Sequence, residues 1–142
     1  AFLDKVATKR NVLSLFIVLL LSYLLSKVWL RFGWKMAGSS DVKVRRAYIA
    51  YASLASDIGL PRRIGETRHE YASRLISTRS FDGSALTKLT EKSVYGQTNA
   101  VHDSEIDQAV SEYIGSFDSG QSKLKRVLAF LSPMSLKRWG KW

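Results

Sequence analysis

The strongest candidate for catalytic chemistry in this sequence is the pair His69-Glu70. In the zinc peptidase motif, a second histidine one helical turn later completes the metal site, and the glutamate acts as the general base. Ser73 occupies the position of that second histidine. The sequence therefore does not predict a zinc site here.

A second group of polar side chains follows His102, with three carboxylates at Asp103, Glu105 and Asp107. Acids in the first turn of a helix are favoured by the helix dipole, so this spacing is typical of a helix start. The chain has no cysteine, which excludes thiolate nucleophiles and thiolate metal sites. No nucleophile, base and orienting group occur together. We therefore predict that the protein is not an enzyme and has no catalytic residues, metal, cofactor or small-molecule substrate.

Three arginines surround Glu66 in one short segment, namely Arg62, Arg63 and Arg68. They could form a docking surface for an acidic partner or for lipid headgroups. Equally, the segment could be a solvated loop with one internal ion pair between Glu66 and an arginine. The following residues, from Thr67 to Glu70, match a capping box, in which the hydroxyl and the carboxylate each cap the other residue's amide.

An apolar segment near the N-terminus indicates a membrane span. Residues 11–26 contain no charge, and the nineteen residues from Val12 to Leu30 are almost all apolar, close to the roughly 20 residues that cross a bilayer. Aromatic and basic residues at one end are typical of the membrane interface, and we assign to it Lys27, Trp29, Arg31, Trp34 and Lys35, with the Lys27 ammonium reaching the headgroups. A cleavable signal peptide and a buried core helix are the alternatives. The long apolar stretch and the lack of a small-residue cleavage site argue against the first, and the small size of the domain argues against the second.

The net charge of +10 is unevenly distributed. Residues 1–46 hold nine Lys/Arg and two acids, residues 47–117 hold seven and nine, and residues 118–142 hold six and one. A nucleic-acid module would place its positive charge on the folded domain. We therefore predict membrane lipids, not nucleic acid, as the partner of the basic ends. More Lys/Arg follow the span than precede it, so the C-terminal domain is expected in the cytoplasm, anchored to the cell membrane by a single pass.

Helical periodicity organises the rest of the chain, and no strand signal of useful length is present. We expect an all-α protein in which a four-helix bundle follows the transmembrane helix. Asp41 is the expected cap of a helix over 42–58, and Ser104 is the expected cap of the last bundle helix. The second helix follows the capping box, and the third runs over 84–94. The predicted divisions are an N-terminal flank (1–11), the span with its interfacial end (12–34), a hinge (35–41), the helical accessory domain (42–117) and a basic amphipathic tail (118–142).

The tail combines an apolar helical face with many basic residues. The face consists of Leu124, Val127, Leu128 and Leu131, and the chain closes on a basic segment that contains Trp139 and Trp142. Such a segment is typical of a helix that lies in the membrane interface, and we assign both tryptophans to that interface. A terminal helix that packs on the bundle is the alternative.

An ordered series of short motifs resembles a known family. The motifs are Gly59-Leu60-Pro61-Arg62, Gly65-Glu66-Thr67, Glu70-Tyr71-Ala72 and Val94-Tyr95-Gly96. Over about residues 41–117, the chain resembles the uncharacterised helical domain at the C-terminus of bacterial and archaeal transglutaminase-like membrane proteins, which also occurs in stand-alone membrane proteins. It departs from the family pattern at Arg68, where proline is usual, and at Val94, where arginine is usual. The resemblance implies a cytoplasmic accessory domain. It does not imply transglutaminase chemistry in this chain, because that fold uses a catalytic cysteine.

These observations lead to one main functional hypothesis and one alternative. The main hypothesis is a non-catalytic, membrane-anchored module for protein interaction or assembly, as an accessory subunit that contacts other membrane-protein subunits. The alternative is the cytoplasmic C-terminal part of a transglutaminase-like membrane enzyme whose catalytic domain lies upstream.

Overall fold

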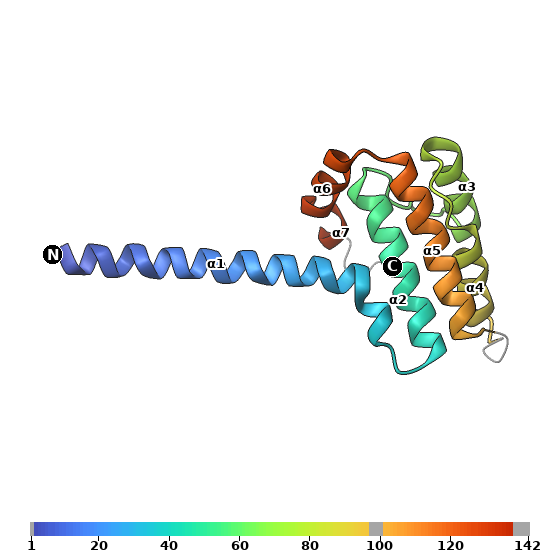
Figure 1. Cartoon of the computed structure of the whole chain (residues 1–142), viewed down its shortest axis with the longest axis horizontal. Helices are drawn as coiled ribbons and strands as arrows, with labels where there is room; N and C mark the ends of the chain where they lie inside the picture. The colour runs from blue at the N-terminus through green and yellow to red at the C-terminus, as the bar shows by residue number, and fades with distance from the viewer. Residues whose placement is uncertain (1, 97–100, 138–142) are drawn as a thin grey trace.

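The computed structural model describes residues 2–96 and 101–137, and within them the protein is all-α (Figure 1). This confirms the predicted fold class. A long first helix projects from a bundle of shorter ones. The elements, in chain order, are α1 (Phe2–Phe32), the 3-10 turn η1 (Gly33–Met36), α2 (Ser40–Asp57), α3 (Arg68–Arg79), α4 (Ser84–Val94), α5 (Asp103–Gly120), α6 (Lys123–Leu131) and α7 (Met134–Lys137).

Helix α1 is long and apolar enough to cross a membrane. Its most apolar eighteen-residue window is only 6% buried against the rest of the protein, unlike the core helix of a soluble domain. Most leucines of this window are exposed, with exposed fractions from 46% at Leu20 to 69% at Leu25; Leu24 is half-buried. The helix already begins at Phe2, so most of the predicted N-terminal flank is helical.

The connection between α1 and α2 is tighter than the predicted hinge. The chain forms the turn η1 directly after α1, and Ser39 then caps α2 by accepting a hydrogen bond from the Val42 amide at 3.4 Å. Asp41 was the expected cap, and this prediction was wrong. Ser39 takes the role because its backbone is extended (φ −141°, ψ 158°), as an N-cap requires.

Helix α2 forms the centre of the bundle, and a cluster of aromatic rings surrounds it. The ring of Tyr51 is fully buried and lies 5.1 Å from Phe81, 5.5 Å from Tyr113 and 6.4 Å from Tyr71, measured between centroids. These partners come from α3, α5 and the α3–α4 connection. Tilted aromatic pairs at such distances add to the stabilisation from buried area, so Tyr51 of α2 connects α3, α5 and the α3–α4 connection through its ring contacts.

The remaining bundle helices begin close to the positions that the sequence predicts. The capping box of Thr67 and Glu70 is present, and α4 spans the predicted residues 84–94. Helix α5 begins at Asp103, because the residue in the cap position is His102, whose backbone amide donates to the Glu105 carboxylate at 3.2 Å. The prediction that Ser104 caps this helix was therefore wrong by two residues.

The basic tail folds into two helices that return to the base of the bundle. Ser122 caps α6, and the chain bends at Pro133 before α7, which lies against α2 and places Ser135 in the interior. Figure 1 shows α6 and α7 on the side of the bundle from which α1 emerges. The tail residues Trp139 and Trp142 lie outside the described residues.

Candidate functional site

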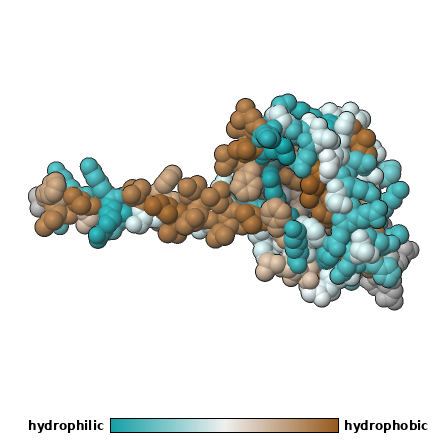
Figure 2. Space-filling model, viewed as in Figure 1, coloured by the Kyte–Doolittle hydropathy of each residue, from teal (hydrophilic) through white to brown (hydrophobic). Residues whose placement is uncertain are grey.

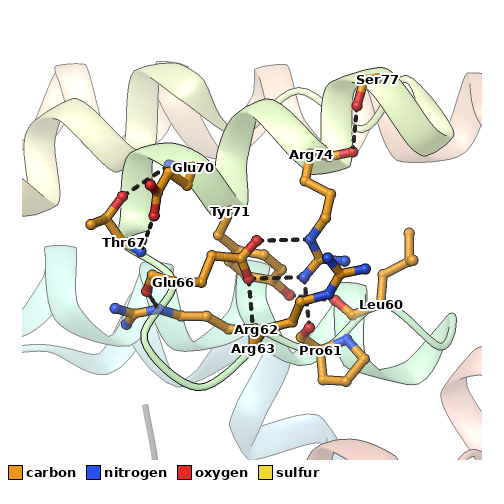
Figure 3. A network of polar contacts seen from close by, with 10 residues as sticks. All are labelled: Leu60, Pro61, Arg62, Arg63, Glu66, Thr67, Glu70, Tyr71, Arg74 and Ser77. Atoms are coloured by element: carbon orange, nitrogen blue, oxygen red, sulfur yellow. Dashed lines mark hydrogen bonds and ion pairs between the residues drawn. The ribbon is translucent and has the colours of Figure 1, made fainter.

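The loop between α2 and α3 is held by a network of polar contacts that centres on Glu66 (Figure 3). The Glu66 carboxylate receives two parallel hydrogen bonds from the Arg74 guanidinium, at 2.8 Å from Nε and 2.9 Å from Nη2. It also accepts the backbone amide of Arg63 at 2.8 Å. This pair is shielded, since the side chains of Glu66 and Arg74 are 10% and 17% exposed. Charge-assisted bidentate pairs of this kind fix geometry as well as adding stability.

Further bonds connect the same loop to α3. Arg74 donates to the Pro61 carbonyl at 2.8 Å, the Tyr71 hydroxyl donates to the Leu60 carbonyl at 2.7 Å, and Arg62 donates to the Glu66 carbonyl at 2.7 Å. Backbone carbonyls in a loop that lacks regular structure need such partners when they are shielded from water. The network therefore gives the loop one defined conformation.

The charges of this cluster shift the pKa values of its members. The hydrogen bonds from Arg74 lower the pKa of the Glu66 carboxyl, and the same contact raises the pKa of Arg74. The Thr67 amide and hydroxyl lower the pKa of Glu70. In each case the charged form of the acid accepts the hydrogen bonds, which favours ionisation. Glu66 and Glu70 are therefore both occupied by structural bonds.

The three arginines that the sequence singled out have separate environments. Arg62 bonds within the loop, the guanidinium of Arg68 lies 5.7 Å from the centre of the Tyr48 ring, and Arg63 is exposed. An internal ion pair of Glu66 is present, as in the alternative of a solvated loop, but its cation is Arg74. Sequence reasoning missed Arg74 because its local partner at helical spacing, Glu70, belongs to the capping box. The docking role of this surface stays a prediction.

A second polar cluster lies at the junction of α1, α2 and α7, where Lys27 is buried. Its ammonium binds the Asp57 carboxylate at 2.6 Å, the Ser135 hydroxyl at 2.7 Å and the Ser132 carbonyl at 2.8 Å. The Ser135 amide in turn donates to Asp57 at 3.2 Å. Both charged side chains are 1% exposed. Lys27 therefore does not reach the headgroups as predicted, because three partners within the protein satisfy all three of its donors.

Arg31 adds a second cation to the junction. One of its guanidinium nitrogens lies 3.5 Å from the Asp57 carboxylate, and the guanidinium carbon lies 4.9 Å from the centre of the Phe130 ring on α6. Two cations thus share one carboxylate in a shielded place. Burying a charge costs a large free energy unless the charge is paired. Asp57 pairs with both cations, so the junction depends on this residue.

The other predicted interface residues divide between surface and core. Trp29 is 43% exposed, whereas Trp34 is 8% exposed and belongs to the hydrophobic core. Lys35 is exposed, and its ammonium lies 5.3 Å from the Phe32 ring and 5.6 Å from the Trp34 ring. Trp34 is buried because η1 folds back against α2. Trp29 and Lys35 thus lie where an interfacial residue could meet lipid, and Trp34 does not.

The residues considered for catalysis do not come together. His69 and His102 are both exposed and begin different helices. Within residues 2–96 and 101–137, no group of three or more histidine, aspartate or glutamate side chains could hold a metal ion. Each carboxylate of the two polar clusters is bonded to a cation or to backbone amides, as described above. The polar clusters of the described residues therefore have structural roles.

Over the part of the chain that the structure describes, fold and clusters together define an all-α protein with one candidate membrane-spanning helix, which a buried ion pair fixes to a helical bundle. Comparison of the chain with family models, with curated proteins and with solved structures finds no match.

Proposed function

We propose that this protein is a non-catalytic, single-pass membrane-anchored module that serves protein interaction or assembly, as an accessory subunit of a membrane complex. The observation that supports this most is the junction of Lys27 with Asp57. The pair connects the exposed apolar helix α1 to the centre of the bundle. A domain fixed in this way presents the same surfaces in a constant orientation to neighbouring subunits.

The junction holds the bundle in one orientation relative to α1, which a flexible linker would not do. A domain on a flexible linker samples many orientations and pays an entropic cost when it docks. Here, contacts from α2, α6 and α7 reach three consecutive turns of α1, at Tyr23, Lys27 and Arg31. Such preorganisation suits a constitutive subunit, and membrane lipids and other membrane-protein subunits are its proposed partners.

Retention in the membrane tests the anchor. The chain expressed in cells should stay in the membrane pellet after alkaline carbonate extraction. Replacing Leu19 and Leu20 with lysine places two charges in the middle of α1, where each charge costs about 2.5–3.5 kcal/mol on insertion scales. This variant should move to the supernatant. Equal extraction of both forms would contradict the anchor.

Orientation is tested by labelling. We propose that the bundle lies in the cytoplasm and that α1 crosses the cell membrane, since more Lys/Arg follow the span than precede it. The chain has no cysteine, so Ile64→Cys gives a single reactive thiol on the exposed loop. A membrane-impermeant maleimide should label it in lysed cells and not in intact cells. Labelling in intact cells would place the bundle on the outside.

The assembly role is tested by purification. The full chain, extracted from its own membranes in mild detergent, should elute with partner proteins at fixed stoichiometry and well above the 16.0 kDa of one chain plus detergent. A monodisperse single chain without partners would contradict the proposal.

A second candidate function is the C-terminal accessory domain of a transglutaminase-like membrane enzyme. It is supported by the motif residues of that resemblance, because Pro61, Arg62, Glu66 and Tyr71 all take part in the loop network. The intact mass of the protein in its native membrane separates the two candidates. A mass near 16.0 kDa favours the accessory subunit, and a much larger chain with an upstream domain favours the enzyme.

A further inference from the structure

Helix α6 exposes a continuous apolar face that no described residue of the bundle covers. The side chains of this face are between 51% and 69% exposed and recur at three- and four-residue steps; they are Leu124, Val127, Leu128 and Leu131. The inner side of the helix is anchored instead, with Ala129 buried in the core and Phe130 beside Arg31. Exposed apolar faces of this kind are unusual on a soluble domain and mark a contact surface.

The position of α6 along α1 sets the depth of this face. The Tyr23 hydroxyl of α1 donates a hydrogen bond to the Leu131 carbonyl at the end of α6, and Arg31 contacts the Phe130 ring. The C-terminal end of α6 therefore lies beside the α1 turns from Tyr23 to Arg31. These are the turns at which the apolar part of α1 meets the bundle.

The opposite side of α1 is also apolar over these turns. Leu25, Val28, Trp29 and Phe32 form one helical face and are 43% to 69% exposed, and at its edge the guanidinium of Arg46 from α2 lies 5.0 Å from the centre of the Trp29 ring. Two apolar surfaces, one on α6 and one on α1, thus lie at the same level on different sides of the junction. Figure 2 shows hydrophobic residues both along α1 next to the bundle and on the part of the bundle where α6 lies. A lipid bilayer that surrounds α1 at this level would cover both surfaces.

Basic residues accompany the apolar face of α6. Lys123 and Lys125 lie in its first turn and are exposed, and Lys123 and Arg126 border a groove lined by Val127, Phe130 and Leu131. Cationic side chains next to a buried apolar stripe are the pattern of helices that lie in the interface of an anionic bilayer. A protein partner would not require this pattern.

We propose that α6 lies in the membrane interface, with the face of Leu124, Val127, Leu128 and Leu131 among the acyl chains of the same bilayer that α1 crosses. This inference rests on the proposed membrane anchor and deepens it. The bundle then contacts the membrane through α1 and α6 together, which fixes its tilt as well as its distance from the surface.

Spin labels on single cysteines test the depth of α6. The chain has no native cysteine, so the full-length variants Leu128→Cys, Leu20→Cys and Ile64→Cys each carry one nitroxide. All three sites are exposed, so the substitutions should leave the fold intact, which circular dichroism checks. The proteins are reconstituted into vesicles of zwitterionic and anionic phospholipids. Collision of each label with oxygen, which concentrates in lipid, is compared with collision with a water-soluble nickel complex.

The expected result is a several-fold higher oxygen-to-nickel collision ratio at residue 128 than at residue 64, with residue 20 highest. If residue 20 is lipid-exposed but residue 128 collides with nickel as freely as residue 64, the anchor stands and the inference about α6 is overturned. A label at residue 128 that is shielded from both reagents would also overturn it, since a second copy or another protein would then cover the face. A water-exposed residue 20 would overturn the anchor itself.

Discussion

Replacing Asp57 with asparagine should destabilise the protein far more than any other loss of one carboxylate described above. Asparagine keeps the size and one acceptor oxygen of the side chain but removes the charge. The Lys27 ammonium, 1% exposed, would then keep only the Ser132 carbonyl and the Ser135 hydroxyl as acceptors. Arg31 would lose the same counter-charge at 3.5 Å.

The expected cost follows from the burial of this pair. Removing one partner of a buried ion pair costs about 3–5 kcal/mol, because the other charge is left uncompensated. For a domain of this size, each kcal/mol lowers the melting temperature by about 4–8 °C, so a fall of at least about 12 °C is expected. The matched control is Asp118→Asn. Its ion pair with Arg126 is 3.2 Å long, but the aspartate side chain is 49% exposed. Exposed pairs contribute at most about 1 kcal/mol.

Thermal unfolding of the full chain in lipid nanodiscs measures this difference, with near-ultraviolet circular dichroism to follow the packed aromatic rings. A variant that replaces both Lys27 and Asp57 with apolar residues should recover part of the loss, since no charge then stays buried. The reasoning would be refuted if Asp57→Asn unfolded within the range of Asp118→Asn. That result would mean that Lys27 is not enclosed between α1, α2 and α7.

Five further substitutions test the loop, the core and helix α5. Glu66→Gln should cost about 1.5–3 kcal/mol at neutral pH, because hydrogen bonds to a charged group are lost. Its effect should depend on pH: the pKa of Glu66 is lower in the folded than in the unfolded protein. The stabilisation is thus complete above the unfolded pKa of about 4.3, and the difference from wild type in pH-dependent melting should shrink as the pH falls through the folded pKa. Gly83→Ala should destabilise the protein by about 1–3 kcal/mol or more, because the new methyl group would lie 2.2 Å from the buried ring of Tyr51. Gly115→Ala is the control, since nothing lies within 4 Å of the new methyl group. It should stabilise α5 by roughly 0.5–1 kcal/mol in the same melts. Tyr71→Phe should lower the free energy of unfolding by about 1 kcal/mol, because its hydrogen bond is lost. Tyr51→Phe should be neutral or stabilising, since the buried Tyr51 hydroxyl has no hydrogen-bond partner among the described residues. A larger loss for Tyr51→Phe than for Tyr71→Phe in denaturant unfolding would contradict this assignment.

Local signals predicted the helices of the bundle well. The capping box at Thr67 and the span of α4 are both present as expected, because each depends on residues a few positions apart. The two helix starts that were wrong, at Asp41 and Ser104, failed for one shared reason. Several residues near each helix start could serve as a cap. The backbone geometry selects among them, and this geometry cannot be read from the sequence.

Long-range pairing explains what the sequence did not reveal. Lys27 and Asp57 are 30 positions apart, and Ser135 is 78 positions from Asp57, so no local pattern relates them. One indirect signal was nonetheless present. Lys27 is the first charge after the uncharged stretch 11–26, and Asp57 is the single charged residue in 47–61. Isolated charges of opposite sign in apolar segments of two helices are each costly alone, so pairing Lys27 with Asp57 would have been a reasonable prediction.

Burial of Lys27 also bears on how α1 fits a bilayer. An α-helix rises 1.5 Å per residue, so the uncharged stretch 11–26 extends over only about 22 Å, less than the roughly 30 Å of hydrocarbon in a bilayer. Because Asp57 holds Lys27 on the side that faces the bundle, the outer face of α1 stays apolar through Val28, Trp29 and Phe32. That face extends about 9 Å past residue 26. On the proposed span, the ion pair that joins the bundle to α1 therefore also removes the charge that would otherwise shorten the membrane-compatible surface of the helix.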